Sequence, residues 1–434
     1  MERLIHFSRN LTGRVAHSIW LSTTPSRIPI NEKNAIPKET SRSPNPVIES
    51  SEFAHKVIDL VQIDDEGVKN AAQYIRKKLL AESYTPRTWR THPLHICPPE
   101  PYDPKDPLNK EVLNWIFLIS ALNFSFWSEK EGRPDRYGVQ WLTGWKSPSP
   151  EKKVWTGYWS LVAALDRALE EAIPITDPHF YSSEESCPDS LIEYVFRPAE
   201  QSSETIPLIR ERIAVMREVG RILCDNFGGS YLEFIENFQR QHDGQGTGLD
   251  LVKIVVETFP PFRDEADFGG RRVCLWKRAQ ILVAETWAAF YPEPSSAPHP
   301  IFPGRRGPEI HHLTMFADYR IPQILHHLRI ITYPASLISK LEAGAPLASG
   351  SPEEVSLRAT SIIAVERVRE EILRLIQTEG TNSEKEYPAG TVSSVLIDFY
   401  LWDLAKRVEG GVETIEGIAT SEMVPIHRTR SIWY

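Results

Sequence analysis

The chain has 434 residues, of which 41% are hydrophobic and 25% charged, so it contains enough apolar side chains to bury a core and is not disordered as a whole. Its 49 Lys and Arg residues against 58 Asp and Glu give a formal net charge of −9, which lacks the basic excess of proteins that hold long nucleic acids by their phosphates. The sequence contains no run of about 18 apolar residues, so no membrane span is predicted. Small anionic ligands remain compatible with this composition.

Residues 1–50 have the composition of a tail. The first thirty carry four arginines, several Ser and Thr and a single acid, which is typical of a mitochondrial targeting segment and equally of a solvated tail. Residues 20–50 are rich in Ser, Pro and Thr and poor in aromatic side chains, which favours disorder. We therefore expect a disordered tail or targeting segment over 1–50 and one compact domain over 51–434.

The cysteines indicate the compartment. Cys97, Cys187, Cys224 and Cys274 are too widely spaced for a zinc framework or a disulfide-stapled secreted domain. This spacing indicates a reducing intracellular compartment. We expect the cytoplasm, with a mitochondrial location as the alternative that the arginine-rich, acid-poor first residues allow.

Helical periodicity dominates from residue 51 onward. Apolar residues recur at intervals of three and four over 64–82, 156–172 and 206–226, and Ser230 has the position of an N-cap for a short following helix. A capping box at 351–354 opens a long helix that is predicted to run to about Gln377. Short strands are predicted only for 271–276 and 428–434. The expected fold is mainly α, a single compact helical domain with at most a small β element.

The proline-rich stretch 291–309 contains too many prolines for regular structure, and we interpret it as a surface insertion. The common motifs for nucleotide binding, zinc proteolysis and serine hydrolysis are absent from the sequence. Adjacent histidines occur at 311–312 and 326–327, but neighbours on a helix point about 100° apart and do not easily ligate one ion. We expect no metal site.

Three clusters of aromatic and acidic residues are more informative. LNFSFW, at 122–127, is by itself typical of a core. In HHLTMFADYRIPQ, at 311–323, Asp318 lies between Phe316 and Tyr319 and directly before Arg320. An acid beside aromatic rings can accept hydrogen bonds from a heterocycle stacked on them. The alternatives are that Asp318 caps the following helix or pairs with Arg320.

The third cluster is LIDFYLWDLAKR, at 396–407. If this segment is helical, Phe399 and Asp403 share one face, and Asp398 projects about 100° away from Phe399. Burying an ionised carboxylate is costly unless it is paired or used, so two acids in an apolar run suggest a division of labour. One would recognise a base while the other stabilises an oxocarbenium ion. The alternative is a pair of ordinary acids near a helix N-terminus.

Six separated segments in consistent order resemble the queuosine salvage protein family from about residue 52 to the last residue: LNFSFW, TGYWSLVAALDRALEEAIPITDP, WKRAQILVAETW, LTMFADYRIPQILHHL, DFYLWDLA and VPIHRTRSIWY. The resemblance implies an N-glycosylase that hydrolyses the glycosidic bond of queuosine 5'-phosphate, a deazaguanosine nucleotide, and releases queuine for tRNA queuosine salvage. It also implies a fold similar to the helix-hairpin-helix DNA glycosylases and no metal or organic cofactor.

The resemblance also implies roles for particular residues. Asp398 would be the catalytic carboxylate, as nucleophile or as stabiliser of the cationic sugar, and Phe399 and Asp403 would contact queuine. Phe316 and Asp318 would stack on and hydrogen-bond the deazaguanine. A further substrate contact, from the less clear motif THPLH, is His92. Cationic candidates for the 5'-phosphate are Lys277, Arg278, Arg320, His427, Arg428 and Arg430. One departure is Glu285, which stands where relatives are expected to have Asp.

Two other functions remain open at this point. A DNA-base glycosylase would fit the implied fold, but the net charge of −9 disfavours it. A non-catalytic helical binding module would use the same aromatic and acidic clusters without chemistry. As partners we expect the small-molecule substrate and its product queuine, with no stable nucleic-acid complex and no membrane, while the oligomeric state is open.

Overall fold

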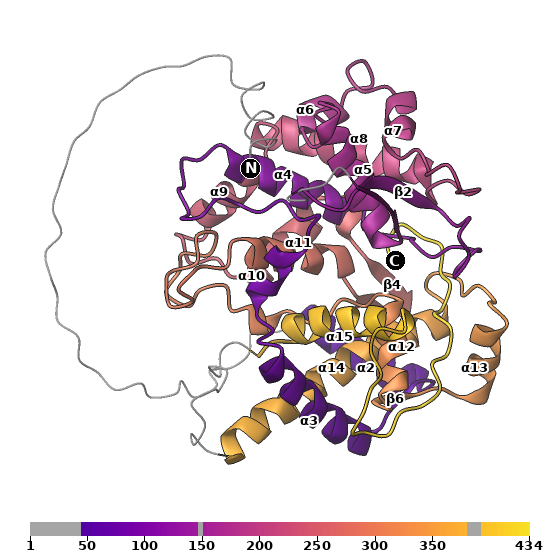
Figure 1. The fold of residues 1–434 in the computed structure, drawn as a ribbon. Helices are drawn as coiled ribbons and strands as arrows, with labels where there is room; N and C mark the ends of the chain where they lie inside the picture. Colours follow the sequence, from indigo (N-terminus) through magenta and orange to yellow (C-terminus); the bar gives the residue numbers. More distant parts are fainter. Residues whose placement is uncertain (1–44, 146–150, 380–391) are drawn as a thin grey trace, which may run out of the picture.

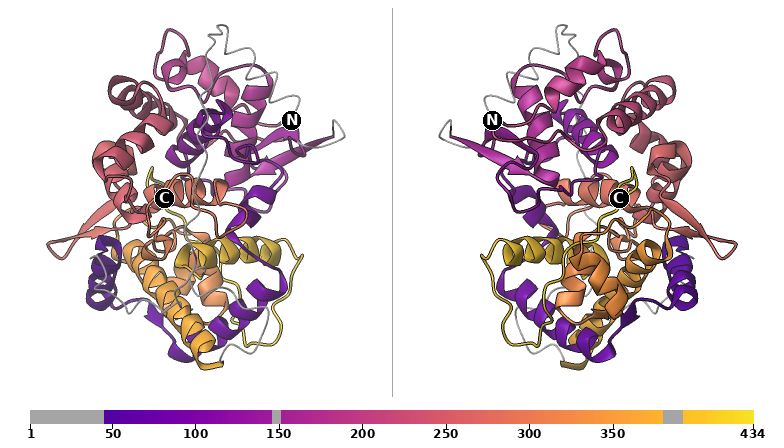
Figure 2. Two further views of the ribbon diagram at one scale, coloured as in Figure 1. Left: turned by 90° about the vertical axis from the view of Figure 1, so that its left-hand side faces the viewer. Right: turned by 90° about the vertical axis from the view of Figure 1, so that its right-hand side faces the viewer.

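The structure is a computed structural model, which describes residues 45–145, 151–379 and 392–434. The chain is mainly helical, as predicted, and its helices form two groups, one above the other in Figure 1. The side views in Figure 2 show the same division. No helix within the described ranges is long and apolar enough to cross a membrane.

The helices of the upper group are α4 (Leu108–Ala121), α5 (Tyr158–Glu170), α6 (Pro178–Tyr181), α7 (Asp189–Val195), α8 (Ile209–Phe227) and α9 (Tyr231–Gln241). The helices of the lower group are α2 (Pro46–Ile58), α3 (Asp65–Ala81), α12 (Arg320–His327), α13 (Ala335–Glu342), α14 (Pro352–Glu379) and α15 (Ser394–Glu409). Between the groups lie α10 (Gly248–Thr258) and α11 (Lys277–Ala289). Short 3₁₀ helices are η1 (Pro86–Thr91), η2 (Pro260–Phe262) and η3 (Ile310–His312).

The strands of the described residues form three separate two-stranded antiparallel sheets. They pair β1 (Gln62–Ile63) with β6 (Ile331–Thr332), β2 (Gly138–Leu142) with β3 (Lys152–Thr156) and β4 (Glu265–Phe268) with β5 (Arg271–Cys274). Strand β5 confirms the prediction for 271–276, but the strand predicted at 428–434 is wrong. The β-pairing of that segment is limited to an isolated bridge between Arg428 and Pro346. Its Thr429 carbonyl instead accepts a hydrogen bond from the indole N–H of Trp127 at 2.9 Å.

The helix starts follow local capping chemistry. The Ser230 side chain accepts the N–H of Glu233, as predicted, and the Asn45 side chain accepts that of Val47 at the start of α2. Because α2 begins at Pro46 and buries Val47 completely, the expected tail is too long by the residues from 45 to 50. The remainder of that tail, with the targeting-segment prediction, lies outside the described residues.

The stretch 291–309 contains no helix or strand, in agreement with its proline content. The prediction that this stretch is a surface insertion is only partly correct, because His299, Ile301 and Phe302 are buried. The imidazole of His299 hydrogen-bonds the Trp287 carbonyl of α11 at 3.0 Å, so the middle of the stretch is anchored to the core.

A buried ion cluster links α14 of the lower group to the start of α11 between the groups. Arg358 of α14 pairs with Asp264 and, at 3.0 Å, with Glu354, and its Nε donates to the carbonyl of Ala317 at 2.9 Å. The Asp264 carboxylate in turn accepts the backbone N–H of Lys277 at 3.2 Å. Arg358 therefore holds both the segment before α12 and the first residue of α11.

Replacing Arg358 by Met is expected to lower the free energy of unfolding by about 3–5 kcal/mol, because two buried carboxylates would lose their partner. Urea unfolding followed by circular dichroism measures the change. The matched control is Arg367→Met, which breaks a 3.0 Å pair with Asp65 between exposed side chains and should cost no more than about 1 kcal/mol. Equal effects of the two substitutions would contradict the assignment.

Candidate active site

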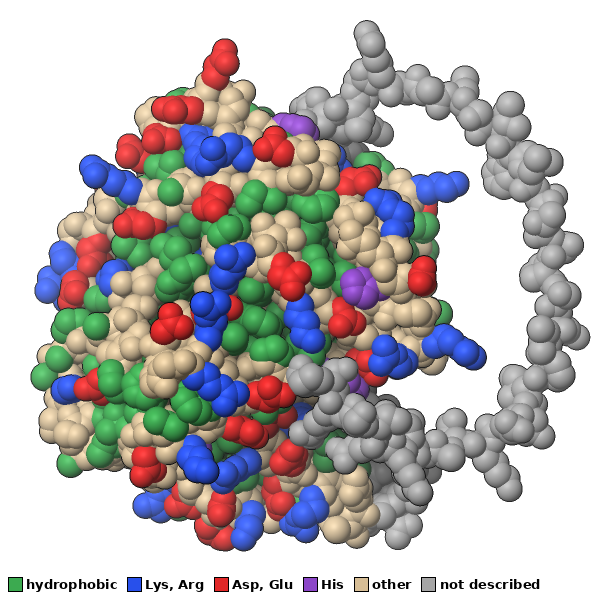
Figure 3. Space-filling model, turned by 180° about the vertical axis from the view of Figure 1, so that it is seen from behind, with side chains coloured by type: hydrophobic (Ala, Val, Ile, Leu, Met, Phe, Trp, Pro, Cys, Tyr) green, Lys and Arg blue, Asp and Glu red, His purple; other side chains and the backbone are tan. Residues whose placement is uncertain are grey.

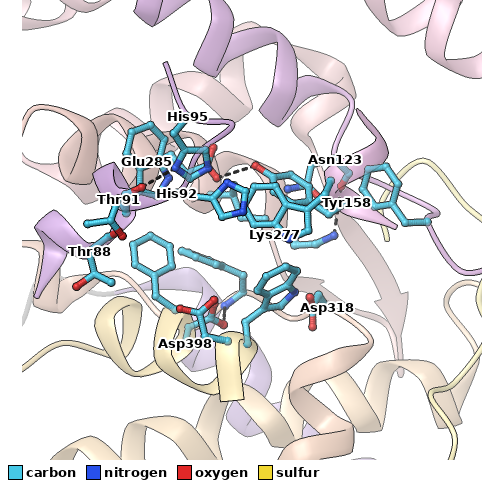
Figure 4. A pocket seen from close by; sticks show the side chains of 18 of the residues that line it. Thr88, Thr91, His92, His95, Asn123, Tyr158, Lys277, Glu285, Asp318 and Asp398 are labelled. Atoms are coloured by element: carbon cyan, nitrogen blue, oxygen red, sulfur yellow. Dashed lines mark hydrogen bonds between the residues drawn. The ribbon is translucent and has the colours of Figure 1, made fainter. Parts of the chain in front are cut away.

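A cavity of about 360 Å³ lies between the two helix groups (Figure 4). Its upper wall comes from the segment around η1, from α5 and from α11, and its lower wall from α15 and the residues before α12. The six residues predicted to contact the base or the sugar all line it: His92, Phe316, Asp318, Asp398, Phe399 and Asp403. Segments that are far apart in the sequence therefore meet in one cavity.

Asp398 lies in the first turns of α15, and its side chain is buried. One carboxylate oxygen accepts the backbone N–H of Phe316 at 2.9 Å, which fixes its orientation. Burial raises the pKa of this carboxyl well above its ordinary value, and the nearby charge of Asp318 raises it further. The Phe316 N–H and the Lys277 ammonium act in the opposite direction. A positive charge that develops beside Asp398 would be strongly stabilised.

Asp318 lies two residues before the start of α12 at Arg320, and it both caps this helix and lines the cavity. Its Oδ1 accepts the backbone N–H groups of Arg320 at 2.8 Å and Ile321 at 2.9 Å, so the capping alternative is correct. The alternative of an ion pair with Arg320 is wrong, because that guanidinium pairs with Glu409 at 2.9 Å. The Asp318 side chain nevertheless lines the cavity, and capping leaves its second oxygen available to a ligand.

Aromatic side chains form much of the wall. The rings of Phe316 and Phe399 lie 5.9 Å apart, and the ring of His92 stacks on Trp159 with centroids 3.5 Å apart and an interplanar angle of 7°. The indole of Trp402 meets that of Trp159 edge-on at 5.8 Å. Burial lowers the pKa of His92 to about 3, so this ring is neutral. The wall suits a planar heterocycle.

His95 lines the same cavity, although the sequence analysis did not select it. Its Nδ1 lies 2.6 Å from the Trp89 carbonyl, which can only accept, so Nδ1 carries the proton. The other nitrogen, Nε2, is buried and has no partner among the described residues. Burial lowers the pKa of this imidazole to about 4, which leaves Nε2 as a hydrogen-bond acceptor at neutral pH.

Glu285 also lines the cavity, although the sequence analysis noted it only as a departure from the relatives. It lies on the same face of α11 as Lys277 and Ile281, at intervals of four residues, and all three line the cavity. Its carboxylate accepts the hydroxyl of Tyr158 at 3.2 Å, and burial raises its pKa to about 7. The spacing places these three residues on one face, but only the packing of α11 shows that this face meets the cavity.

Of the six candidates for the 5'-phosphate, Lys277 lines the cavity. The side chains of the other five contact protein groups elsewhere: Arg278 the carbonyls of Ala121 and Pro261, Arg320 the carboxylate of Glu409, His427 the hydroxyl of Tyr434, Arg428 the carboxylate of Glu129, and Arg430 the carbonyls of Ser125 and Trp127. Within the described ranges, no three His, Cys, Asp or Glu side chains are arranged to hold a metal ion.

An aromatic cavity that buried carboxylates also line has the chemistry to hold a planar heterocycle. The family model of the queuosine salvage protein matches residues 102–434, and the chain belongs to this family. A relative from Schizosaccharomyces pombe is 36% identical over 397 residues, covering 89% of this chain and 99% of the relative. A relative from Mus musculus is 35% identical over 388 residues, covering 89% of this chain and 98% of the relative. A relative from Sphaerobacter thermophilus is 32% identical over 374 residues, covering 86% of this chain and 93% of the relative. All three are named queuosine 5'-phosphate N-glycosylase/hydrolase.

Proposed function

We propose that this protein hydrolyses the N-glycosidic bond of queuosine 5'-phosphate and releases queuine. The observation that carries the proposal is the hydrogen bond from the backbone of Phe316 to the Asp398 carboxylate, inside an aromatic cavity that Asp318 also lines. This hydrogen bond connects Asp398, which can stabilise a sugar cation, to the segment of Phe316 and Asp318, which can bind the base. The names of the relatives support the same reaction.

In the proposed complex, Phe316 and Phe399 contact the faces of the deazaguanine ring. The ring presents a ring N–H and an exocyclic amine as adjacent donors, and Asp318 accepts from this edge. A base without these donors would leave the second oxygen of this half-buried carboxylate without a donor and would be rejected. Asp403, whose carboxylate also accepts the Tyr84 hydroxyl at 2.6 Å, contacts the part of queuine that lies beyond the ring.

Cleavage of the bond between the base and C1' leaves positive charge on the ribose. Asp398 stabilises this charge, either through its own negative charge or by forming a transient bond to C1'. Water then supplies the hydroxyl group on C1', and its proton ends on the nitrogen of the departing base. The products are queuine and ribose 5-phosphate, and no oxidant or reductant is needed.

The reaction gives a direct test. Purified protein incubated with queuosine 5'-phosphate should release free queuine, which mass spectrometry detects. Queuosine without its phosphate and guanosine 5'-phosphate serve as comparison substrates. Absence of queuine from both queuosine substrates would overturn the proposed function.

The pH dependence follows from the raised pKa of Asp398. Only the ionised carboxylate stabilises a cation, and its raised pKa keeps the protonated form populated to higher pH than for an ordinary aspartate. We therefore expect kcat/KM to fall as the pH decreases, with a midpoint well above about 4. Because Glu285 has a pKa of about 7, the profile is also measured with Glu285→Gln, which should keep the acid limb. A midpoint near 4 in both proteins would contradict the role of Asp398.

The proposal includes a fold relationship to the helix-hairpin-helix DNA glycosylases and a location in the cytoplasm, which agrees with cysteines that are present as thiols. A DNA substrate is the second candidate, and the net charge of −9 and the face shown in Figure 3 disfavour it. On the face shown in Figure 3, Lys and Arg side chains are interspersed with Asp and Glu. Strong, salt-dependent affinity for duplex DNA would favour that candidate.

A further inference from the structure

Lys277 has a position that its assignment as a phosphate candidate does not explain. It is the first residue of α11, its side chain is 3% exposed, and it lines the cavity. Its ammonium donates to the Asn123 carbonyl at 3.2 Å, which uses one of three N–H donors. Figure 4 shows Lys277 above Asp318 at one end of the cavity, with Asp398 farther along the lower wall.

The charges around Lys277 do not suit a phosphate. Burial lowers the pKa of Lys277 to about 8. Among the charges around it, the Asp318 carboxylate has the largest effect and raises this pKa, ahead of the guanidiniums of Arg358 and Arg278, which lower it. Lys277 in turn lowers the pKa of Asp398. One ammonium thus faces two carboxylates, and a phosphate dianion placed beside it would be repelled by both acids. A neutral acceptor avoids this repulsion and can still accept a hydrogen bond from Lys277.

The deazaguanine ring offers such an acceptor. Its carbonyl oxygen O6 is adjacent to the ring N–H, so the edge presents an acceptor beside two donors. Asp318 and Lys277 present the complementary pattern, a carboxylate acceptor beside an ammonium donor. Both side chains are already held by the protein, Asp318 by its caps to α12 and Lys277 by Asn123.

We infer, on the basis of the proposed function, that Lys277 donates a hydrogen bond to O6 of the deazaguanine and activates the base as a leaving group. When the bond from C1' to N9 breaks, both electrons stay on the base. A 7-deazaguanine has a carbon atom where guanine has N7, so it has no N7 lone pair to protonate. The charge instead spreads through the ring to O6, where the ammonium stabilises it. The base takes its proton at N9 from the water that attacks C1'.

The substitution Lys277→Met tests this inference with two substrates, queuosine 5'-phosphate and queuosine. We expect kcat to fall about 10²-fold with both, because a hydrogen-bond donor to the developing charge is lost. The ratio of the two kcat/KM values should stay as in the unsubstituted protein. A selective loss with the phosphorylated substrate would instead make Lys277 a phosphate ligand and overturn the inference. An unchanged kcat would also overturn it.

A substrate change gives a second test. An analogue of queuosine 5'-phosphate with sulfur in place of O6 keeps the ring N–H that Asp318 accepts, but its sulfur is a weaker hydrogen-bond acceptor. The unsubstituted protein should therefore prefer the oxygen substrate more strongly than Lys277→Met does, because the change at O6 and the loss of Lys277 affect one contact. The same preference in both proteins would contradict the inference.

The controls separate this inference from the function itself. Lys340→Met removes an exposed ammonium that pairs with Glu353, and it should leave both substrates unaffected. Lys277→Arg keeps a donor and should recover part of kcat. If the unsubstituted protein releases queuine but Lys277→Met is fully active, the function stands and the role of Lys277 fails. If the unsubstituted protein releases none, the proposed function fails first.

Discussion

Replacing Asp398 by Asn is expected to lower kcat/KM for queuine release about 10³-fold or more, which corresponds to roughly 4 kcal/mol of lost transition-state stabilisation. Asn keeps an oxygen that can accept the Phe316 N–H, now seen at 2.9 Å, so the local geometry should survive. What is lost is the negative charge beside the sugar. The substitution therefore isolates electrostatic or nucleophilic catalysis from the placement of the side chain.

Single-turnover rates with queuosine 5'-phosphate, read as free queuine, measure this effect. Binding of queuine and the thermal midpoint of the same variant serve as controls, since both should be close to those of the unsubstituted protein. Asp189→Asn, which alters an exposed acid paired with Arg217, is the matched surface substitution. Asp398→Asn activity within tenfold of the unsubstituted protein would remove Asp398 from the chemistry.

Replacing Asp318 by Asn should lower kcat/KM about 10³-fold through a different step, the recognition of the base. The Asn amide would direct donors at the donors of the ring and lose the charge-assisted hydrogen bonds. Its oxygen can still accept the N–H groups of Arg320 and Ile321, so the helix start should hold. Asp318→Ala also loses the cap and should cost about 0.5–2 kcal/mol of stability in addition.

Comparing the two Asp318 variants separates capping from recognition. Denaturant unfolding should show a loss of stability for the Ala variant and little for the Asn variant, while both lose activity and affinity for queuine. An active Asn variant would mean that Asp318 acts only as a helix cap. The pair of variants thus distinguishes the two functions that its position combines.

Periodicity and capping located the helices, because they depend on local spacing. Helix α3 over Asp65–Ala81, helix α8 over Ile209–Phe227 and the N-cap at Ser230 follow directly from the order of residues. The strand predicted at 428–434 failed for the opposite reason. An apolar and aromatic run is compatible with a strand or with an irregular segment, and the contacts of Thr429 and Ser431 with residues 125–127 decide between them.

The acidic and aromatic part of the site could be predicted from clusters, whereas its cations could not. A positive residue in a motif does not reveal where its side chain points, and Arg278, Arg320 and Arg430 all bind groups of the protein itself. Every residue of α11 is buried, so no polar face marks which side of this helix meets the cavity. Lys277 and Glu285 could therefore be placed only once the packing of α11 was known.

The indoles in the cavity wall provide an optical signal for occupancy. Trp89, Trp159 and Trp402 all line the cavity, and two of them already lie within ring contact of one another. A deazapurine that enters should quench their emission. Because Asp398→Asn is designed to bind without turnover, titrating that variant with intact queuosine 5'-phosphate would report ground-state affinity by fluorescence alone, separate from any rate.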